Sequence, residues 1–126
     1  MSWQTYVDSN LVGTGSIAQA AIYGVQGGVW AASSGFALQG NEFQDLAQAF
    51  QDPSGIRANG LYLGGTKYFT LRADPRSIYG KQGAGGVVCV KTGQAILIGT
   101  YGDGTAPGEA TKVVEALADY LISVGY

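Results

Sequence analysis

Histidine is absent from this chain of 126 residues, and cysteine occurs only once, at Cys89. Without histidine the chain can form neither a Ser-His-Asp triad, nor a Cys-His nucleophile pair, nor a His-ligated metal site. A single cysteine cannot form an internal disulfide, which is typical of proteins from a reducing compartment. Much common catalytic chemistry is therefore excluded.

Charge is also scarce: 13% of the residues are charged and the net charge is −2, which indicates no nucleic-acid partner. The charges are unevenly distributed, because residues 67–91 carry five basic side chains against Asp74 alone, whereas acids outnumber bases on both sides of this segment. Two interpretations stay open. The segment is either an ordinary solvated face of a sheet or a basic surface that meets an acidic partner.

The longest uncharged stretch, residues 9–41, is interrupted by several glycines and polar residues. No run approaches the ~20 apolar residues that a spanning helix needs. The chain also opens without the basic and apolar regions of a secretory signal. We therefore expect a soluble cytoplasmic protein.

Helical spacing of apolar residues appears in three places, and the length suits one domain over residues 1–126. Residues 2–11 form a short amphipathic pattern that Ser2 can cap. A second pattern begins at Asn41 and ends at Asp52-Pro53. A third begins at Pro107, with Val113, Leu117 and Leu121 as its apolar stripe.

Between these helices the sequence alternates β-prone runs with glycine-containing turns. Because the connections are short, neighbouring strands must be antiparallel. The sequence predicts an α+β fold with a central antiparallel sheet of six or seven strands, the terminal helices on one face and the short middle helix on the other. The strands are expected within residues 17–23, 29–32, 61–63, 67–73, 77–80, 87–91 and 95–101.

No motif nominates a catalytic site. Residues 13–18 match the G-x-G-x-x-A dinucleotide pattern, but here a helix precedes the glycines and a strand follows them, which is the reverse of the required order. The carboxylates lie among polar residues without an apolar pocket to raise a pKa, and they lack metal-site spacing. We interpret the chain as a non-enzyme without cofactor or metal.

Aromatic residues are concentrated at the two ends of the sequence, where Trp3, Tyr6, Tyr120 and Tyr126 lie within thirteen positions, and Trp30 follows the first hairpin turn. Each ring alone could simply hold a terminal helix against the sheet. As a group, Trp and Tyr combine flat apolar faces with hydrogen-bond donors. This combination suits a polyproline II segment, which offers flat rings and free carbonyl groups.

At this point the sequence resembles the profilins. The resemblance covers the whole chain and is carried by the segments SWQTYVD (2–8), VWAAS (29–33), RSIYGK (76–81), PGEA (107–110) and ADYL (118–121). The short length is similar to that of protist and fungal forms. The resemblance implies a monomeric cytoplasmic protein of the cytoskeleton that binds actin monomers, promotes nucleotide exchange on actin and binds proline-rich proteins such as formins.

Site residues follow from the resemblance by position. The polyproline site would comprise Trp3, Tyr6, Trp30, Tyr120, Leu121 and Tyr126. The actin face would comprise Lys67, Arg72, Arg76, Lys81, Lys91, Thr111 and Lys112. In animal relatives a histidine occupies the place of Tyr120, and other relatives carry a charged residue in place of Ala116.

Two rival functions are distinguishable by experiment. A membrane regulator would bind phosphoinositides through the basic segment, weakly and in a salt-sensitive manner. A small-molecule sensor or hydrolase would need a pocket with convergent polar groups, of which the sequence shows none.

Overall fold

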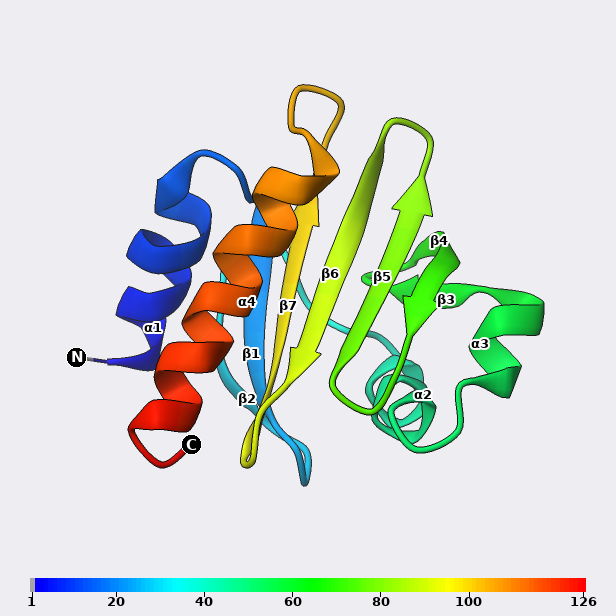
Figure 1. Cartoon of the computed structure of the whole chain (residues 1–126), viewed down its shortest axis with the longest axis horizontal. Coiled ribbons are helices and arrows are strands. Elements are labelled where there is room, and N and C mark those ends of the chain that lie inside the picture. The colour runs from blue at the N-terminus through cyan, green and yellow to red at the C-terminus, as the bar shows by residue number, and fades with distance from the viewer. Residues whose placement is uncertain (1) are drawn as a thin grey trace.

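The structure is a computed structural model that describes residues 2–126 (Figure 1). Its helical segments are α1 (Trp3–Thr5), the π-helical η1 (Tyr6–Leu11), the 3-10 turn η2 (Val12–Thr14), α2 (Glu42–Ala49), α3 (Ser54–Asn59) and α4 (Pro107–Ser123). Its strands are β1 (Gln19–Gly24), β2 (Val29–Ala32), β3 (Leu61–Leu63), β4 (Thr66–Ala73), β5 (Ser77–Gln82), β6 (Gly85–Lys91) and β7 (Ala95–Tyr101).

The seven strands form one sheet in the order β2-β1-β7-β6-β5-β4-β3, and every neighbouring pair is antiparallel. This confirms the predicted meander. Strand β7 lies in the interior of the sheet, between β1 and β6, and all of its residues are buried. Its unbroken apolar run Ile96, Leu97 and Ile98 is therefore covered on both faces of the sheet.

Two hydrophobic layers enclose the sheet, as expected. On one face, Val7 and Leu11 of η1 and Leu117 of α4 pack with inward side chains of the central strands. On the other face, Leu46 of α2 and Ile56 of α3 pack with the opposite set of strand residues. Figure 1 shows η1 and α4 side by side on the near face, with α2 and α3 at the other end of the molecule.

The first helix begins as the sequence predicts, because the Ser2 hydroxyl accepts a hydrogen bond from the Thr5 amide at 3.1 Å. It continues beyond the expected end at Leu11 into η2, and the chain then turns at Gly15, whose φ is +81°. A positive φ of this size favours glycine, so Gly15 ends the helical region.

Three details differ from the sequence-based expectation. Helix α3 was not predicted; the Asp52 carboxylate accepts hydrogen bonds from the Ser54 amide and hydroxyl, which starts a new helical turn after Pro53. In α4 the fully buried valine is Val114, and Val113 is only partly buried. Strand β1 begins at Gln19, two residues after the expected start of the first strand at residue 17.

No helix within residues 2–126 is both long enough and apolar enough to cross a membrane.

Candidate functional site

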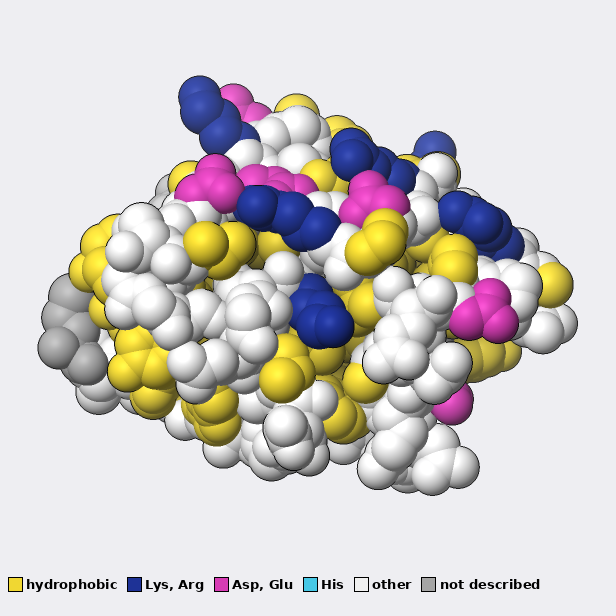
Figure 2. All heavy atoms as spheres, turned by 60° about the horizontal axis from the view of Figure 1, so that its bottom comes forward, with side chains coloured by type: hydrophobic (Ala, Val, Ile, Leu, Met, Phe, Trp, Pro, Cys, Tyr) yellow, Lys and Arg dark blue, Asp and Glu magenta, His cyan; other side chains and the backbone are white. Residues whose placement is uncertain are grey.

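Five aromatic rings from three parts of the chain meet where the terminal helices lie against β2. Trp3 is central: its ring centroid lies 5.6 Å from that of Tyr6, 4.6 Å from Trp30 and 4.9 Å from Tyr126. Tyr6 in turn lies 6.2 Å from Tyr120. We call these five residues the aromatic ledge. Figure 2 shows hydrophobic side chains gathered at this end of the molecule, on the left.

The end of α4 places Tyr126 by a specific turn. The Tyr126 amide donates to the Leu121 carbonyl at 2.8 Å, and the Gly125 amide donates to the Ile122 carbonyl at 3.2 Å. Together with the φ of +99° at Gly125, these two bonds form a Schellman motif. The backbone oxygen of Tyr126 also accepts from the Thr92 hydroxyl at 2.9 Å. The Tyr126 ring is thus held beside Trp3.

The Trp30 indole packs against Gly24 of the neighbouring strand, where there is no side chain. A Cβ atom on Gly24 would lie 2.8 Å from the Trp30 indole nitrogen, which is closer than real contacts allow. Gly24 belongs to β1, and the pairing of β1 with β2 shifts register between Ile22 and Tyr23. The glycine and the shift together leave room for the indole.

The ledge carries hydrogen-bond donors that have no partner within residues 2–126. The indole nitrogens of Trp3 and Trp30 form no hydrogen bond within residues 2–126. Every buried side-chain nitrogen or oxygen in this part of the chain has a partner, so these two unpaired N–H groups are not buried and are accessible to solvent. The pKa of Tyr6 is raised above its usual 10.0, chiefly by the hydrogen-bonding influence of the Tyr120 side chain. The Tyr6 hydroxyl therefore remains protonated at neutral pH and can donate.

Leu121 does not belong to the exposed ledge. Its side chain is 0% exposed and lies in the core cluster against which Trp3, Tyr6 and Trp30 pack. The physical reason is the helical period, which turns Leu121 toward the sheet while Tyr120 remains 48% exposed. Leu121 supports the rings from beneath, so the structure brings it to the ledge but not to the exposed surface of the ledge.

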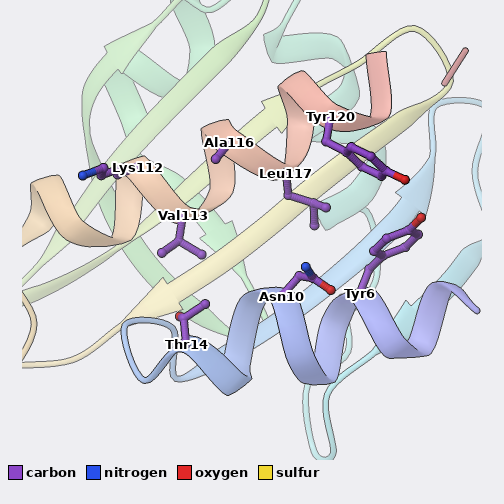
Figure 3. Close-up of a pocket in the computed structure, with 8 residues that line it drawn as sticks. All are labelled: Tyr6, Asn10, Thr14, Lys112, Val113, Ala116, Leu117 and Tyr120. Carbon is purple, nitrogen blue, oxygen red and sulfur yellow. The ribbon is translucent and has the colours of Figure 1, made fainter. Parts of the chain in front are cut away.

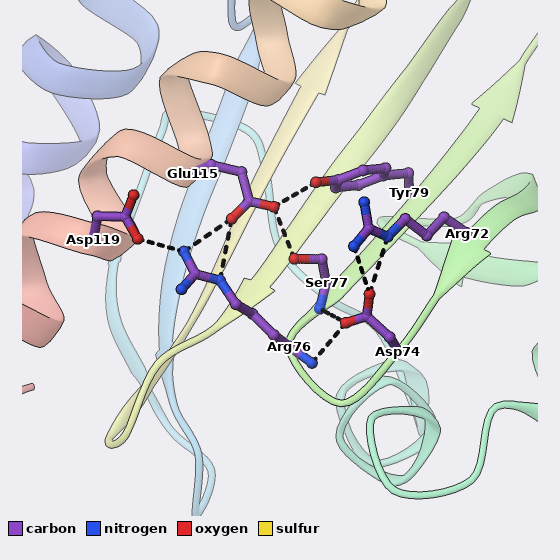
Figure 4. Close-up of polar contacts among 7 residues, drawn as sticks. All are labelled: Arg72, Asp74, Arg76, Ser77, Tyr79, Glu115 and Asp119. Carbon is purple, nitrogen blue, oxygen red and sulfur yellow. Dashed lines mark hydrogen bonds and ion pairs between the residues drawn. The ribbon is translucent and has the colours of Figure 1, made fainter.

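Both arginines of the basic segment are paired with acids, whereas its three lysines form no ion pair within residues 2–126 (Figure 4). Arg76 donates to Glu115 at 3.0 Å and to Asp119 at 2.7 Å, both on α4. Arg72 donates to Asp74 at 2.9 Å, and its guanidinium lies 5.4 Å from the Tyr79 ring centroid. Figure 2 shows positive and negative side chains alternating along the α4 side of the molecule. A continuous basic patch is therefore absent from this part of the described chain.

Glu115 is the centre of this network. Its carboxylate accepts hydrogen bonds from the Tyr79 hydroxyl, from the Ser77 hydroxyl at 2.7 Å and from Arg76. Burial, followed by the bond to Glu115, raises the pKa of Tyr79 above 10.0. The backbone amides of Ser77 and Arg76, together with Arg72, hold the pKa of Asp74 below its usual 3.8. These contacts fix α4 to the β4–β5 turn.

The other predicted actin-face residues lie on two opposite faces. Lys81 shares a face with Tyr79, toward α4, because side chains alternate along β5. The Lys67 ammonium group lies over the Phe69 ring. Phe69 pairs in register with Lys81, so Lys67, Phe69 and Lys81 lie on the same face. Lys91 shares the opposite face with Cys89, beside Ala47 of α2. Lys91 is thus separated from the rest by the thickness of the sheet, so the structure does not bring it together with them.

On α4, the Thr111 hydroxyl donates to the Pro107 carbonyl at 2.9 Å. Lys112 lies on the outer side of the helix, at the rim of a groove that faces η1.

Sequence reasoning missed three exposed apolar side chains on β3 and β4. Tyr62 is 50% exposed, Phe69 66% and Leu71 61%. Tyr62 pairs with Lys67 and Phe69 with Lys81, so both lie on the face toward α4, and Leu71 lies at the register shift of β4. The sequence carried no clear signal for them, because Tyr68 between them is buried and apolar residues occupy both faces of the strand.

The aromatic ledge and the surface around Tyr62, Phe69 and Leu71 offer contact areas and hydrogen-bond donors. Within residues 2–126 no group of three or more His, Cys, Asp or Glu side chains is placed to hold a metal. The fold and site together define a small α+β binding domain.

Comparison with known proteins gives the family. The Profilin family model matches residues 1–126. The chain is 58% identical over 126 residues to Profilin-2 of Acanthamoeba castellanii, with 100% of both chains covered. The crystal structure of A. castellanii profilin II matches at a TM-score of 0.96 with 58% identity, covering 99% of this chain and 100% of that one. The chain belongs to the profilin family, whose members are cytoskeleton-associated, actin-binding regulators.

A more distant structure contains a ligand. Mouse profilin IIa in complex with a double repeat from the FH1 domain of mDia1 matches at a TM-score of 0.82 with 26% identity, covering 100% of both chains.

Proposed function

We propose that this protein binds proline-rich segments of partner proteins, formins among them, on its aromatic ledge and an actin monomer on the face formed by α4, β4 and β5. The observation that carries the proposal is the ledge itself, with five joined rings and two indole N–H groups that have no partner within residues 2–126. Polyproline II segments present flat pyrrolidine rings and carbonyl acceptors, so the two surfaces are complementary. Such a ligand is extended before binding, which keeps its ordering cost small.

Titration with a proline polymer tests the ledge directly, because both tryptophans of the chain belong to it. We expect tryptophan fluorescence to change on binding and the Trp3→Ala variant to lose the interaction. The matched control is Tyr62→Ala, which removes an exposed aromatic ring far from the ledge and should bind normally. If the fluorescence of folded wild-type protein does not change when the polymer is added, the proposal is contradicted.

The proposed actin face has the composition of a protein interface. Tyr62, Phe69 and Leu71 form its apolar part, and Lys67, Lys81 and Arg72 surround them. Interfaces commonly combine an apolar centre with a polar rim. Glu115 and Asp119 hold Arg76, so we assign Arg76 the role of fixing the β4–β5 turn; Thr111 and Lys112 extend the face along α4.

Charge-reversing substitutions on the two faces of the sheet test which face binds actin. We expect Lys81→Glu and Phe69→Ser to weaken binding of an actin monomer about tenfold or more, since Phe69→Ser removes an apolar contact at the centre of the face and Lys81→Glu reverses a charge beside it. Lys91→Glu makes the same charge change on the far side and should leave the affinity unchanged. Equal losses for Lys81→Glu and Lys91→Glu would exclude the assignment.

Promotion of nucleotide exchange is the further part of the proposal. It requires no chemistry by this protein, only a higher affinity for actin with an open nucleotide cleft than for closed actin. Release of a fluorescent nucleotide from actin should accelerate with wild-type protein and not with Lys81→Glu at the same concentration.

Phosphoinositide binding is the alternative use of the basic segment. Because Arg72 and Arg76 are paired with acids, mainly lysines remain to attract an anionic lipid. We expect co-sedimentation with phosphoinositide vesicles to be weak and to disappear at about 0.15 M salt. Retention on vesicles at higher salt would favour the lipid function.

A further inference from the structure

A groove adjoins the aromatic ledge and extends between the two terminal helices (Figure 3). Its volume is about 460 Å³. One wall carries Tyr6, Asn10 and Thr14, which are spaced one helical turn apart along η1 and η2. The other wall is α4, which contributes Lys112, Val113, Ala116, Leu117 and Tyr120. The groove has the size of a ligand site rather than of a packing defect.

The chemistry of the groove changes along its length. Val113, Ala116 and Leu117 make its middle apolar, and the small side chain of Ala116 leaves the space open. Lys112 lies at the rim of the far end, and its ammonium group forms no ion pair within residues 2–126. The groove therefore suits an apolar group followed by a carboxylate.

The groove and the ledge share two residues. Tyr6 and Tyr120 belong to both, and their hydroxyl groups point toward one another in Figure 3. A ligand lying on the ledge therefore reaches the groove by crossing this pair of rings. From Tyr120 to Lys112 the helix rises ~12 Å, which an extended polyproline II chain covers in about four residues.

We propose that this groove binds the residues that flank a proline-rich segment on one side, with apolar side chains over Ala116 and an acidic residue at Lys112, about four positions from the proline nearest to the groove. The inference rests on the proposed polyproline function and deepens it, because it names the sequence of the partner next to its prolines. The ledge alone selects prolines, whereas the groove selects their neighbours.

Peptide titrations test the groove. The probes are a proline decamer, the same decamer with Gly-Leu-Leu-Asp after it, and the decamer with Asp-Leu-Leu-Gly before it. Because the ligand has a direction on the ledge, we expect one of the extended peptides to bind about tenfold more tightly than the decamer. Replacement of its aspartate by lysine should remove most of this gain.

Two variants attribute the gain to the groove. Ala116→Gln fills its middle and Lys112→Gln removes its charge, so both should reduce the tenfold gain to about twofold or less while binding the plain decamer normally. Lys67→Gln is the matched control, since it removes a charge outside the groove, and it should retain the full gain.

The outcomes separate the two proposals. A wild-type protein that does not bind the decamer refutes the polyproline function. Normal decamer binding with no gain from either extension, or a gain that Ala116→Gln and Lys112→Gln leave intact, overturns the groove assignment alone.

Discussion

The role of Arg76 that the sequence suggests differs from the role that the structure indicates. In the sequence it adds to a basic segment that could attract an acidic partner. In the structure it lies between Glu115 and Asp119, with its guanidinium satisfied by both carboxylates. The two carboxylates outweigh its single positive charge, and the pairs are partly exposed, with 42% of the Arg76 side chain, 23% of Glu115 and 69% of Asp119 accessible, so each pair contributes modestly. Arg76 therefore stabilises the fold.

Gly24 gives a prediction at the same scale. Gly24→Ala places a methyl group 2.8 Å from the Trp30 indole nitrogen and 3.1 Å from the Gly27 carbonyl oxygen. We expect overpacking to lower the free energy of unfolding by about 1–3 kcal/mol and to shift the tryptophan emission of the folded protein. Urea unfolding followed by fluorescence measures both.

Gly102→Ala is the control for this variant, because a Cβ atom there meets no atom within 4 Å. Its unfolding free energy should stay within about 0.5 kcal/mol of wild type. If Gly24→Ala is equally mild, the indole is not held against β1.

Among the elements, α4 has the largest number of roles. It covers the sheet, supplies Tyr120 to the ledge, forms a wall of the groove and fixes the β4–β5 turn through Glu115. A shift of this one helix would alter all of these features together.

Glu115→Gln tests the attachment of α4 to β5. The substitution keeps the size of the side chain but removes the charge that Arg76, Ser77 and Tyr79 share. We expect the free energy of unfolding to fall by about 2 kcal/mol, the usual range for hydrogen bonds to a charged group. Glu109→Gln, at the exposed start of the same helix, should cost at most about 1 kcal/mol. Equal losses in denaturant titrations would contradict a specific role for Glu115.

Local signals predicted most elements, and tertiary contacts decided the rest. Strands β2, β3 and β7 have the bounds that their apolar runs and flanking glycines indicate. Helix α3 was missed because its start depends on the Asp52 side chain, whereas the Asp-Pro pair is typical of a helix end.

The candidate site was predictable to a similar degree. The clustering of aromatics at both ends of the sequence indicated five rings that the structure joins. The burial of Leu121, the opposite placement of Lys91 and the exposure of Phe69 depend on which way each side chain faces after the sheet forms. The spacing of residues in the sequence could not predict which face each side chain takes, because β4 contains a register shift.

For the whole molecule, titratable groups predict a wide plateau of stability with pH. The pKa of Asp74 and that of Asp52 lie below 3.8 in the folded state, so their stabilisation is complete above that pH and is lost as the pH falls. Burial raises the pKa of Tyr68 and Tyr101 above 10.0, so stability is lost again as the pH rises beyond 10.

Because histidine is absent, no side chain should titrate between about pH 5 and 8. Urea midpoints measured from pH 2 to 11 should be flat over that interval, and Asp74→Asn should reduce the decline in acid. Above about pH 8 stability should begin to fall, because the thiol of Cys89 ionises in the unfolded chain before it ionises in the folded one. A transition centred near pH 6.5 would be inconsistent with this account.

Cys89 provides a second prediction for the whole molecule. The side chain is 0% exposed in the centre of β6, and burial raises the pKa of its thiol. A thiol reagent should therefore modify the folded protein at least about a thousand times more slowly than the unfolded chain. The modification rate in low denaturant should follow global unfolding, and rapid labelling of the native protein would show that β6 opens locally.

The aromatic ledge joins residue 3 to residue 126, which places the two ends of the sequence in ring contact. Trp3 and Tyr6 come from the start of the chain, Trp30 from β2, and Tyr120 and Tyr126 from the end, so the binding surface is incomplete before α4 has docked. Any ligand of the ledge stabilises only chains in which all three segments are present. We therefore expect a partner that binds the ledge to bind only complete, folded copies of the chain and not truncated or partly folded ones.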